Sequence, residues 1–433
     1  MTDLNAQPLS DHEPIYRRNF FIFLTDNILF TLAMSMIGPT TLIPDFIRHL
    51  TRSEVLIGFS SSLFDVGWTL PQLFISRFIV RFERKKWWFV GPNIPVRFVM
   101  LTFAGLTVLL GKDRPGAILL AFLICYAIAA VGDGIVGVPW MVLAGSSLDG
   151  RWRARMFGLT TAFAGVIMLG VAPLIGIVLG SAGPVFPNNY ALIFGVAGLM
   201  FALSILPFLF IHELPGGKVA EKIPSMAEFL PSLGHVLRTD VPFRAMIVTR
   251  MLTSLFAMAG PFYIGFATVQ LGLSSTVAVP TLLAMQTIGS VCGALIYTWM
   301  GARRNLLFIR LALGLAAFLP VSALLASVTG PLPLYLGFLI SGLTGHNIFI
   351  GYMNWVITYT THDQRPIYAG LFNTIGAVIS LIAPFIGGTI AQQVGYEALF
   401  VVALAMVLGA LFVTLRYIHH PHPVETLSLA STD

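Results

Sequence analysis

Long apolar runs alternate with short polar segments along this chain of 433 residues. Twelve of the runs reach or exceed the roughly 20 residues that a helix needs to cross a bilayer. A polar stretch near the middle, residues 212–241, holds seven of the charged side chains and separates six runs from six others. The pattern therefore predicts an all-α membrane protein with twelve spanning helices in two groups of six.

The apolar runs also give approximate bounds for each predicted helix. Membrane barrels instead show short segments of about 10 alternating residues, so strands are not predicted. Several runs exceed the length that a perpendicular helix needs, which predicts tilted helices. The twelve helices are expected near residues 19–43, 54–80, 87–111, 115–143, 153–181, 189–211, 242–270, 276–300, 304–327, 331–360, 365–393 and 396–418.

The two groups of six helices resemble each other in sequence. The Gly-Pro pair at residues 38–39 recurs at residues 260–261, and Ala172–Gly176 recurs as Ala383–Gly387. Two copies of one six-helix unit, joined by the central segment, explain both matches. The predicted organisation is an N-terminal tail (1–18), a first bundle (19–211), a central cytoplasmic loop (212–241), a second bundle (242–418) and a C-terminal tail (419–433).

The composition excludes an ordinary soluble protein. Hydrophobic residues make up 56% of the chain, charged residues only 10%, and the mean hydropathy is +0.85. A soluble domain carries about 25% charged residues, so the solvent for most of this surface must be lipid. The two cysteines, Cys125 and Cys292, both lie in apolar runs and can build neither a disulfide framework nor a metal site. We therefore expect no cofactor.

The positive charges predict the orientation in the membrane. The N-terminal segment, the even-numbered connections and the C-terminal end hold 19 Lys and Arg residues, and the odd-numbered connections hold four. Basic loops stay on the cytoplasmic side. Both termini are therefore expected in the cytoplasm, in a multi-pass protein of the cell membrane. This distribution also accounts for the net charge of +6 without a nucleic-acid partner.

Six ionisable residues lie well inside the predicted spans. A charge at the centre of a span costs at least about 2.5 kcal/mol, so a charge kept there usually faces the protein interior and has a function. Together with two neighbouring amides, these residues form the predicted pathway for substrate and protons: Asp26, Asp65, Arg97, Asp133, Arg250, His346, Asn347 and Asn354.

Several of these residues also have a purely structural interpretation. Arg97 could be the counter-ion of Asp65 or of Asp133, because an unpaired guanidinium is not stable when buried. Arg250 is near enough to the end of its span to reach the membrane surface. His346 could be a neutral core residue instead of a proton carrier.

The carboxylates indicate coupling to protons. Burial disfavours the charged form of a carboxylate, which makes it able to take up a proton near neutral pH. The chain has no Gly-x4-Gly-Lys-Ser/Thr stretch, so it does not contain a P-loop that would bind ATP.

The segment after the second span resembles the signature of the major facilitator superfamily. The family pattern Gly-x-Leu-Ala-Asp-Arg-x-Gly-Arg-Lys aligns with Ser76–Lys85, where the three basic positions match and Val80 replaces the aspartate. Basic loops after the fourth and tenth spans are also similar to those of the family. The resemblance implies a cytoplasmic gate made of Arg81, Arg84, Lys85, Asp149, Arg151, Asp363 and Arg365.

The resemblance covers residues 17–416 and implies a secondary transporter. Such a protein moves a small solute by alternating access, and here we expect a monomer with proton coupling. Two other hypotheses remain open. One is an intramembrane aspartyl protease, because Ala130–Asp133 is one glycine short of Gly-x-Gly-Asp. The other is a sensor or lipid-binding relative that does not transport.

Overall fold

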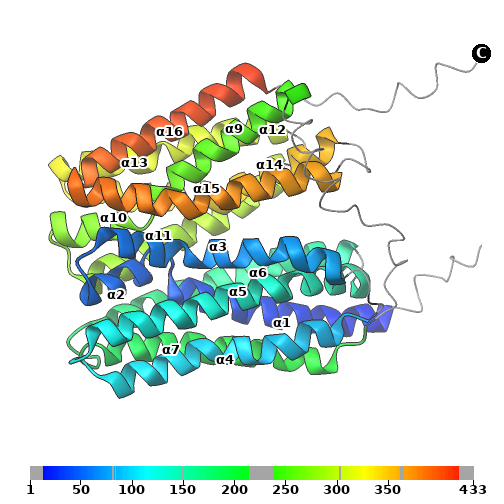
Figure 1. Cartoon of the computed structure of the whole chain (residues 1–433), viewed down its shortest axis with the longest axis horizontal. Helices are drawn as coiled ribbons and strands as arrows, with labels where there is room; N and C mark the ends of the chain where they lie inside the picture. The colour runs from blue at the N-terminus through cyan, green and yellow to red at the C-terminus, as the bar shows by residue number, and fades with distance from the viewer. Residues whose placement is uncertain are drawn as a thin grey trace, which may run out of the picture. The chain divides into compact units, whose positions relative to one another are not determined.

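The computed structural model describes residues 13–79, 82, 84–148, 150–213, 238–301, 304–360 and 365–418. Within these ranges all the regular structure is helical (Figure 1). The first half contains α1 (Glu13–Ile37), α2 (Leu42–Leu50), α3 (Glu54–Ile79), α4 (Lys86–Leu110), α5 (Pro115–Ser147), α6 (Gly150–Leu179), α7 (Asn188–Ser204) and the 3-10 helix η1 (Leu206–Phe210).

The second half begins with a segment whose helical geometry changes along its length. It consists of α9 (Val241–Phe256), η2 (Ala257–Ala259), α10 (Phe262–Gly265) and η3 (Phe266–Gln270). The remaining helices are α11 (Ser275–Ile296), η4 (Tyr297–Gly301), α12 (Asn305–Ala316), α13 (Phe318–Thr329), α14 (Leu332–Tyr359), α15 (Arg365–Gln393) and α16 (Tyr396–Tyr417).

Eleven helical segments within the described residues are long and apolar enough to cross a membrane. They coincide with eleven of the twelve predicted runs. The remaining run is α3, which has 26 residues but carries three serines at positions 60–62 together with Asp65 and Gln72. Its length suffices for a span, whereas its polar side chains lower its hydropathy. The most polar of the predicted spans is therefore the one that holds Asp65.

The first span ends earlier than the sequence predicts. Helix α1 stops at Ile37, because Gly38 adopts a φ of +52° that only glycine takes up readily. Pro39 follows, and the separate short helix α2 begins at Leu42. The same Gly-Pro pair at residues 260–261 keeps helical geometry, so the two copies of this motif differ in structure.

The described chain forms two compact units. Unit 1 contains residues up to 37, 70–171 and 178–222, and unit 2 contains residues 38–69, 172–177 and those from 223 onward. The predicted division into bundles 19–211 and 242–418 stays a prediction, and in the structure α2 and the first part of α3 belong to unit 2. The central segment 214–237 and the C-terminal tail lie outside the described residues.

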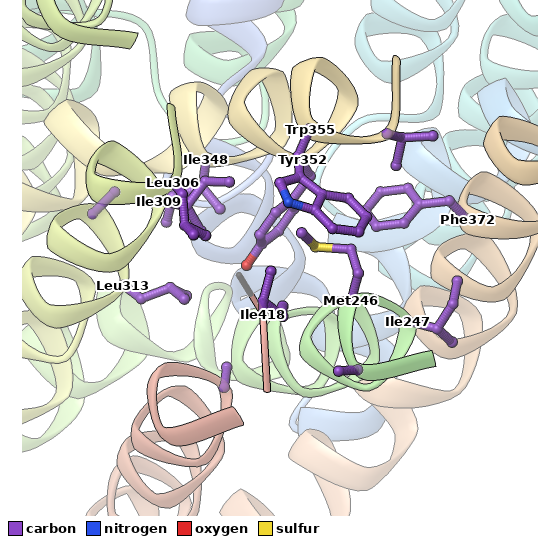
Figure 2. Close-up of a cluster of buried hydrophobic side chains, with 14 of the residues drawn as sticks. Met246, Ile247, Leu306, Ile309, Leu313, Ile348, Tyr352, Trp355, Phe372 and Ile418 are labelled. Atoms are coloured by element: carbon purple, nitrogen blue, oxygen red, sulfur yellow. The ribbon is translucent and has the colours of Figure 1, made fainter. Parts of the chain in front are cut away.

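The core of unit 2 lies where α9, α12, α14, α15 and α16 meet. Figure 2 shows Tyr352 and Trp355 of α14 packed with Met246 and Phe372, and all four side chains are almost completely buried. Burying such large apolar and aromatic groups gives these helices dispersion contacts that fix their packing in lipid. This core supports the part of α9 that carries Arg250.

Helices α11 and α14 pack backbone against backbone in unit 2. A Cβ atom on Gly342 would collide with the carbonyl oxygen of Gln286, and one on Gly289 would collide with that of Leu339. Small residues allow this close approach in membranes, where van der Waals packing is a main source of helix association. The glycines of this pair are therefore required for packing.

Candidate functional site

Arg97 of α4 and Asp133 of α5 form a buried ion pair in unit 1. Nη1 of Arg97 lies 3.2 Å from Oδ1 of Asp133, and the two side chains are 6% and 7% exposed. This contact identifies Asp133 as the counter-ion, which the sequence left open between Asp65 and Asp133. The pairing matches the physical requirement that a buried charge needs a partner at hydrogen-bonding distance.

Two glycines place the ion pair. A Cβ on Gly132 would collide with Val96, so the missing side chain lets α5 lie directly against α4 beside Arg97. On the other side, a Cβ on Gly198 of α7 would lie 2.5 Å from the backbone nitrogen of Leu101. Helix α4 is therefore held closely between α5 and α7 at the level of the guanidinium.

Two aromatic rings cover the Arg97 guanidinium. Its Cζ atom is 4.8 Å from the ring centre of Phe30 and 5.5 Å from that of Phe201. A guanidinium is attracted to the face of an aromatic ring within about 6 Å, and the attraction strengthens when water is excluded. The rings thus help to compensate the desolvation of Arg97 and fix its orientation.

Asp26 of α1 is a second buried carboxylate in the same unit. It is 3% exposed, and its Oδ2 accepts a hydrogen bond of 3.1 Å from the indole Nε1 of Trp140. Its other oxygen, Oδ1, is buried without a hydrogen-bond partner. Among the described residues no cation lies within 4.0 Å of Asp26. Asp26 lies one turn of α1 before Phe30, whose ring covers Arg97, so two carboxylates in unit 1 lie near one guanidinium, which is paired with Asp133.

Arg250 of α9 is the central cation of unit 2. Its Cζ atom lies 5.3 Å from the ring centre of Phe349 and 5.6 Å from that of Phe372. A Cβ on Gly376 of α15 would lie 2.9 Å from the same Cζ atom, so the guanidinium packs directly against the backbone of α15 at this glycine. Phe372 is labelled in Figure 2, in the core that supports this side of α9.

Asp65 of α3 is the predicted pathway carboxylate that belongs to the same unit as Arg250. Helix α3 packs on α15, where a Cβ on Gly58 would lie 2.9 Å from the carbonyl oxygen of Pro384, and Asp65 is about two turns further along α3, on the side of Gly376 and Arg250. Unlike Asp26 and Asp133, Asp65 is exposed, and it forms no ion pair within 4.0 Å in the described part of the chain. Of the two carboxylates that the sequence offers as counter-ion of Arg97, Asp133 is therefore the one that fills this role.

The amides predicted to lie on the pathway are in α14. Asn347 is buried, and its Nδ2 donates to the carbonyl oxygen of Leu343, while Asn354 is half-buried. The side chain of His346 lies outside the described residues. The roles of all three in substrate binding or proton transfer stay predictions.

Most of the predicted cytoplasmic gate falls outside the described part of the chain, namely Arg81, Asp149, Asp363 and the side chain of Arg365. Arg84 and Arg151 are exposed. Lys85 is buried, and its backbone N–H donates to Oε1 of Glu213, whose Oε2 accepts from the backbone of Lys86. The gate itself therefore remains a prediction.

Sequence reasoning missed a hydrogen-bonded ionic network at the start of α3. Both Nη atoms of Arg48 donate to the carboxylate of Glu54, the second at 3.0 Å. The hydroxyl of Tyr396, at the start of α16, donates to Glu54 Oε1 at 2.7 Å and accepts from Arg48 Nη1 at 3.0 Å. The three side chains thus connect the segment around α2 to the last helix of unit 2.

The network keeps Arg48 charged. Burial by itself disfavours the charged form, but the hydrogen bonds that Arg48 donates to Glu54 and Tyr396, together with the attraction of these groups, outweigh it and raise the pKa of Arg48 above its ordinary value. Space for the guanidinium comes from Gly265, because a Cβ there would collide with Nη2 of Arg48. In the sequence, Arg48 and Glu54 are visible only as charges near the ends of predicted spans. Nothing there indicates that Glu54 bonds to Tyr396, 342 residues away.

The sequence model of the Major Facilitator Superfamily matches residues 27–343 and 311–433. Among curated proteins, no sequence matches this chain significantly. Similar solved structures include a point mutant of the nucleoside transporter NupG, with a TM-score of 0.68 and 15% identity over 92% of this chain and 100% of that one. A D-xylose-proton symporter gives 0.67 and 11% over 94% and 99%. The human organic anion transporter MFSD10 gives 0.53 and 18% over 94% and 100%.

At these identities the structural likeness shows the fold, while the sequence match shows the family. The twelve predicted spans, the helical architecture and the family match agree, and they identify a multi-pass membrane protein that transports small molecules and is not an enzyme. The interpretation as an intramembrane aspartyl protease is therefore wrong, and Asp133 is paired with Arg97. The chain belongs to the Major Facilitator Superfamily.

Proposed function

We propose that this protein is a proton-coupled secondary transporter that works as a monomer in the cell membrane, with both termini in the cytoplasm. The family membership supports a secondary transporter of alternating-access type. The proton, the orientation and the monomeric state are our additions. One of the similar structures is described as a proton symporter, which is compatible with proton coupling in this fold.

The observation that supports proton coupling is the environment of Asp26. An ionised carboxylate buried without a counter-ion costs several kcal/mol, whereas the neutral acid can occupy the same space at much lower cost. Asp26 has one hydrogen bond, from Trp140, and one buried oxygen without a partner. We infer that Asp26 carries the proton, and that Asp133 is held ionised by Arg97.

This assignment gives each residue a distinct role. Arg97 supplies a fixed positive charge that keeps Asp133 ionised. Trp140 holds the Asp26 carboxylate in place through its indole N–H. With both carboxylates ionised, Asp26, Asp133 and Arg97 together carry a charge of −1, and a proton on Asp26 brings this charge to zero. Such a change can favour one conformation of a transporter over another.

We further propose that the Arg48–Glu54–Tyr396 network closes the non-cytoplasmic side. The first two spans are joined by an odd-numbered connection, which the charge distribution assigns to that side. Close backbone contacts accompany the network, since a Cβ on Gly388 would lie 2.6 Å from Cα of Val55. A Cβ on Gly58 would similarly lie 2.9 Å from the carbonyl oxygen of Pro384.

Transport in reconstituted vesicles tests proton coupling. A solute that stabilises the purified protein is first found by thermal shift, because a ligand stabilises the state that it binds. Its uptake is then compared with and without an imposed pH gradient, in the native protein and in Asp26→Asn. We expect the gradient to drive accumulation only in the native protein, while solute exchange between equal concentrations persists in the variant.

Three outcomes would contradict this proposal. Native flux that ignores the pH gradient would remove proton coupling. Gradient-driven accumulation by Asp26→Asn would show that another group carries the proton. Ligand binding without any flux would favour the sensor or lipid-binding alternative instead.

A further inference from the structure

We propose that Arg250 and Asp65 together bind a zwitterionic solute, with its anionic group on Arg250 and its cationic group facing Asp65. The proposal rests on the proposed transport function and names the class of substrate. It uses only unit 2, which contains both residues.

The first argument is that Arg250 is held in a fixed position without a carboxylate partner. Phe349 and Phe372 lie on it, and the bare backbone of α15 at Gly376 borders its guanidinium. Its Nε atom is buried and has no hydrogen-bond partner. A donor group that is already oriented loses little entropy when an anion binds, which favours recognition of a carboxylate by this side chain.

The second argument is that Asp65 is near Arg250 but not bonded to it. Helix α3 runs antiparallel along α15, with Val55 against Gly388 and Gly58 against Pro384. Asp65 lies about two turns beyond Gly58, and Gly376, which borders Arg250, lies about two turns from Pro384 in the matching direction. No ion-pair contact within 4.0 Å joins Asp65 and Arg250 in the described chain. Arg97 and Asp133, in contrast, approach to 3.2 Å. A pair kept only for stability would be expected to close in the same way, because the attraction between unit charges grows steeply at short distance.

The third argument concerns which ligand charge fits both residues. A simple anion at Arg250 would meet the negative charge of Asp65, and a simple cation at Asp65 would meet Arg250. A solute that carries both charges satisfies both residues and brings no net charge into the membrane. The exposed side chain of Asp65 leaves it accessible to such a solute.

Binding to purified protein tests the inference with probes that differ only in charge. One set is L-phenylalanine, phenethylamine and 3-phenylpropanoate, and the smaller set is L-alanine, ethylamine and propanoate. We expect at least one amino acid to raise the melting temperature and to bind at least about tenfold more tightly than its amine and its acid, a difference of about 1.4 kcal/mol. Binding of the amine or the acid as tightly as the amino acid would overturn the inference, as would no binding by either amino acid.

Two variants assign the charges. Arg250→Gln should lose at least about tenfold in affinity for the amino acid, while Arg244→Gln, an exposed position on the same helix, should keep native affinity. Asp65→Asn should bind the acid as well as the amino acid, because it removes the charge that repels a simple anion. Native discrimination in Asp65→Asn, or native affinity in Arg250→Gln, would contradict the assignment.

This test is independent of proton coupling because it measures binding without flux. Zwitterion binding that depends on Arg250, combined with flux that ignores a pH gradient, would keep the subsite and remove the proposed coupling. Proton-driven flux of a solute whose binding does not depend on Arg250 would keep the proposed coupling and remove the subsite.

Discussion

The hydroxyl of Tyr396 donates a hydrogen bond to the carboxylate of Glu54 at 2.7 Å, although 342 residues separate them in sequence. The bond links the first turn of α3 to the first turn of α16. Arg48 donates to the same carboxylate with both of its Nη atoms, so the three side chains form one hydrogen-bonded network. Loss of any member leaves the others with unpaired polar groups in a partly buried place.

Tyr396→Phe is expected to loosen this closure without disturbing the fold. The change removes one hydrogen bond to a carboxylate, worth about 1.5–3 kcal/mol, and keeps the ring. If the closed form is favoured by a similar amount, the open population rises by about tenfold or more. The measurement is the labelling rate of a cysteine introduced at Thr51 after Cys125 and Cys292 have been replaced by alanine, compared between Tyr396→Phe and the same background with Tyr396 intact.

Tyr417→Phe is the matched control, because Tyr417 lies at the other end of α16 and is exposed. It should label at the native rate. Equal labelling of the Tyr396 variant and this control would show that the network does not hold the closed form.

The contact between α11 and α14 predicts a sharp difference between two glycines of one helix. Gly342→Val should destabilise the protein by several kcal/mol, because the new side chain would enter the backbone of α11 at Gln286. Gly345→Val, three residues on, meets nothing within 4 Å and should change stability little. Thermal unfolding in detergent measures both, and similar melting temperatures for the two variants would contradict the packing argument.

The pair of Arg97 and Asp133 predicts strong non-additivity. Removing one partner leaves a buried, uncompensated charge, at a cost of about 3–5 kcal/mol, whereas removing both leaves an apolar site. We therefore expect Arg97→Leu and Asp133→Leu to be strongly destabilising alone and much less so together. Unfolding of the two single variants and the double variant in detergent gives the coupling energy. Additive losses would show that the two side chains do not stabilise each other.

The sequence predicts the architecture because membrane spans need long apolar runs, and these are visible without any tertiary information. The twelve predicted runs correspond to eleven apolar helical segments and to α3. The break after Ile37 was not predicted. A Gly-Pro pair by itself does not show that a helix ends, because Gly38-Pro39 ends α1 whereas the same pair at residues 260–261 lies in a continuous helical segment. Whether a Gly-Pro pair bends or ends a helix depends on its packing partners.

The burial of Asp26, Arg97 and Asp133 was predictable from the sequence, their pairings were less so, and their roles in transport stay predictions. The cost of a charge in lipid marks Asp26, Arg97, Asp133 and Arg250 as special in the sequence alone. Which carboxylate meets Arg97 depends on Gly132, because its missing side chain lets α5 approach α4 at that level. A single sequence does not show which faces of two helices meet, even when the helices follow one another in the chain.

Asp240 gives a last prediction about how the Arg250 region is held. Its carboxylate caps α9 by accepting from the backbone N–H of Phe243 at 2.9 Å. It also accepts from the hydroxyls of Tyr359 in α14 and Tyr368 in α15, at 2.7 and 2.9 Å. These are the three helices that carry Arg250 and the parts around it, so one side chain ties their ends together.

Asp240→Ala should therefore reduce stability by about 2 kcal/mol or more, since it removes a helix cap and leaves two hydroxyls without their acceptor. The double variant Tyr359→Phe/Tyr368→Phe separates the two effects, because it keeps the cap and removes only the tie between helices. If the tie positions Arg250, this double variant should weaken binding of the amino-acid probe while the melting temperature falls less than in Asp240→Ala. Unchanged binding in the double variant would mean that Asp240 acts only as a cap, and that the apolar core around Trp355 alone sets the position of α9.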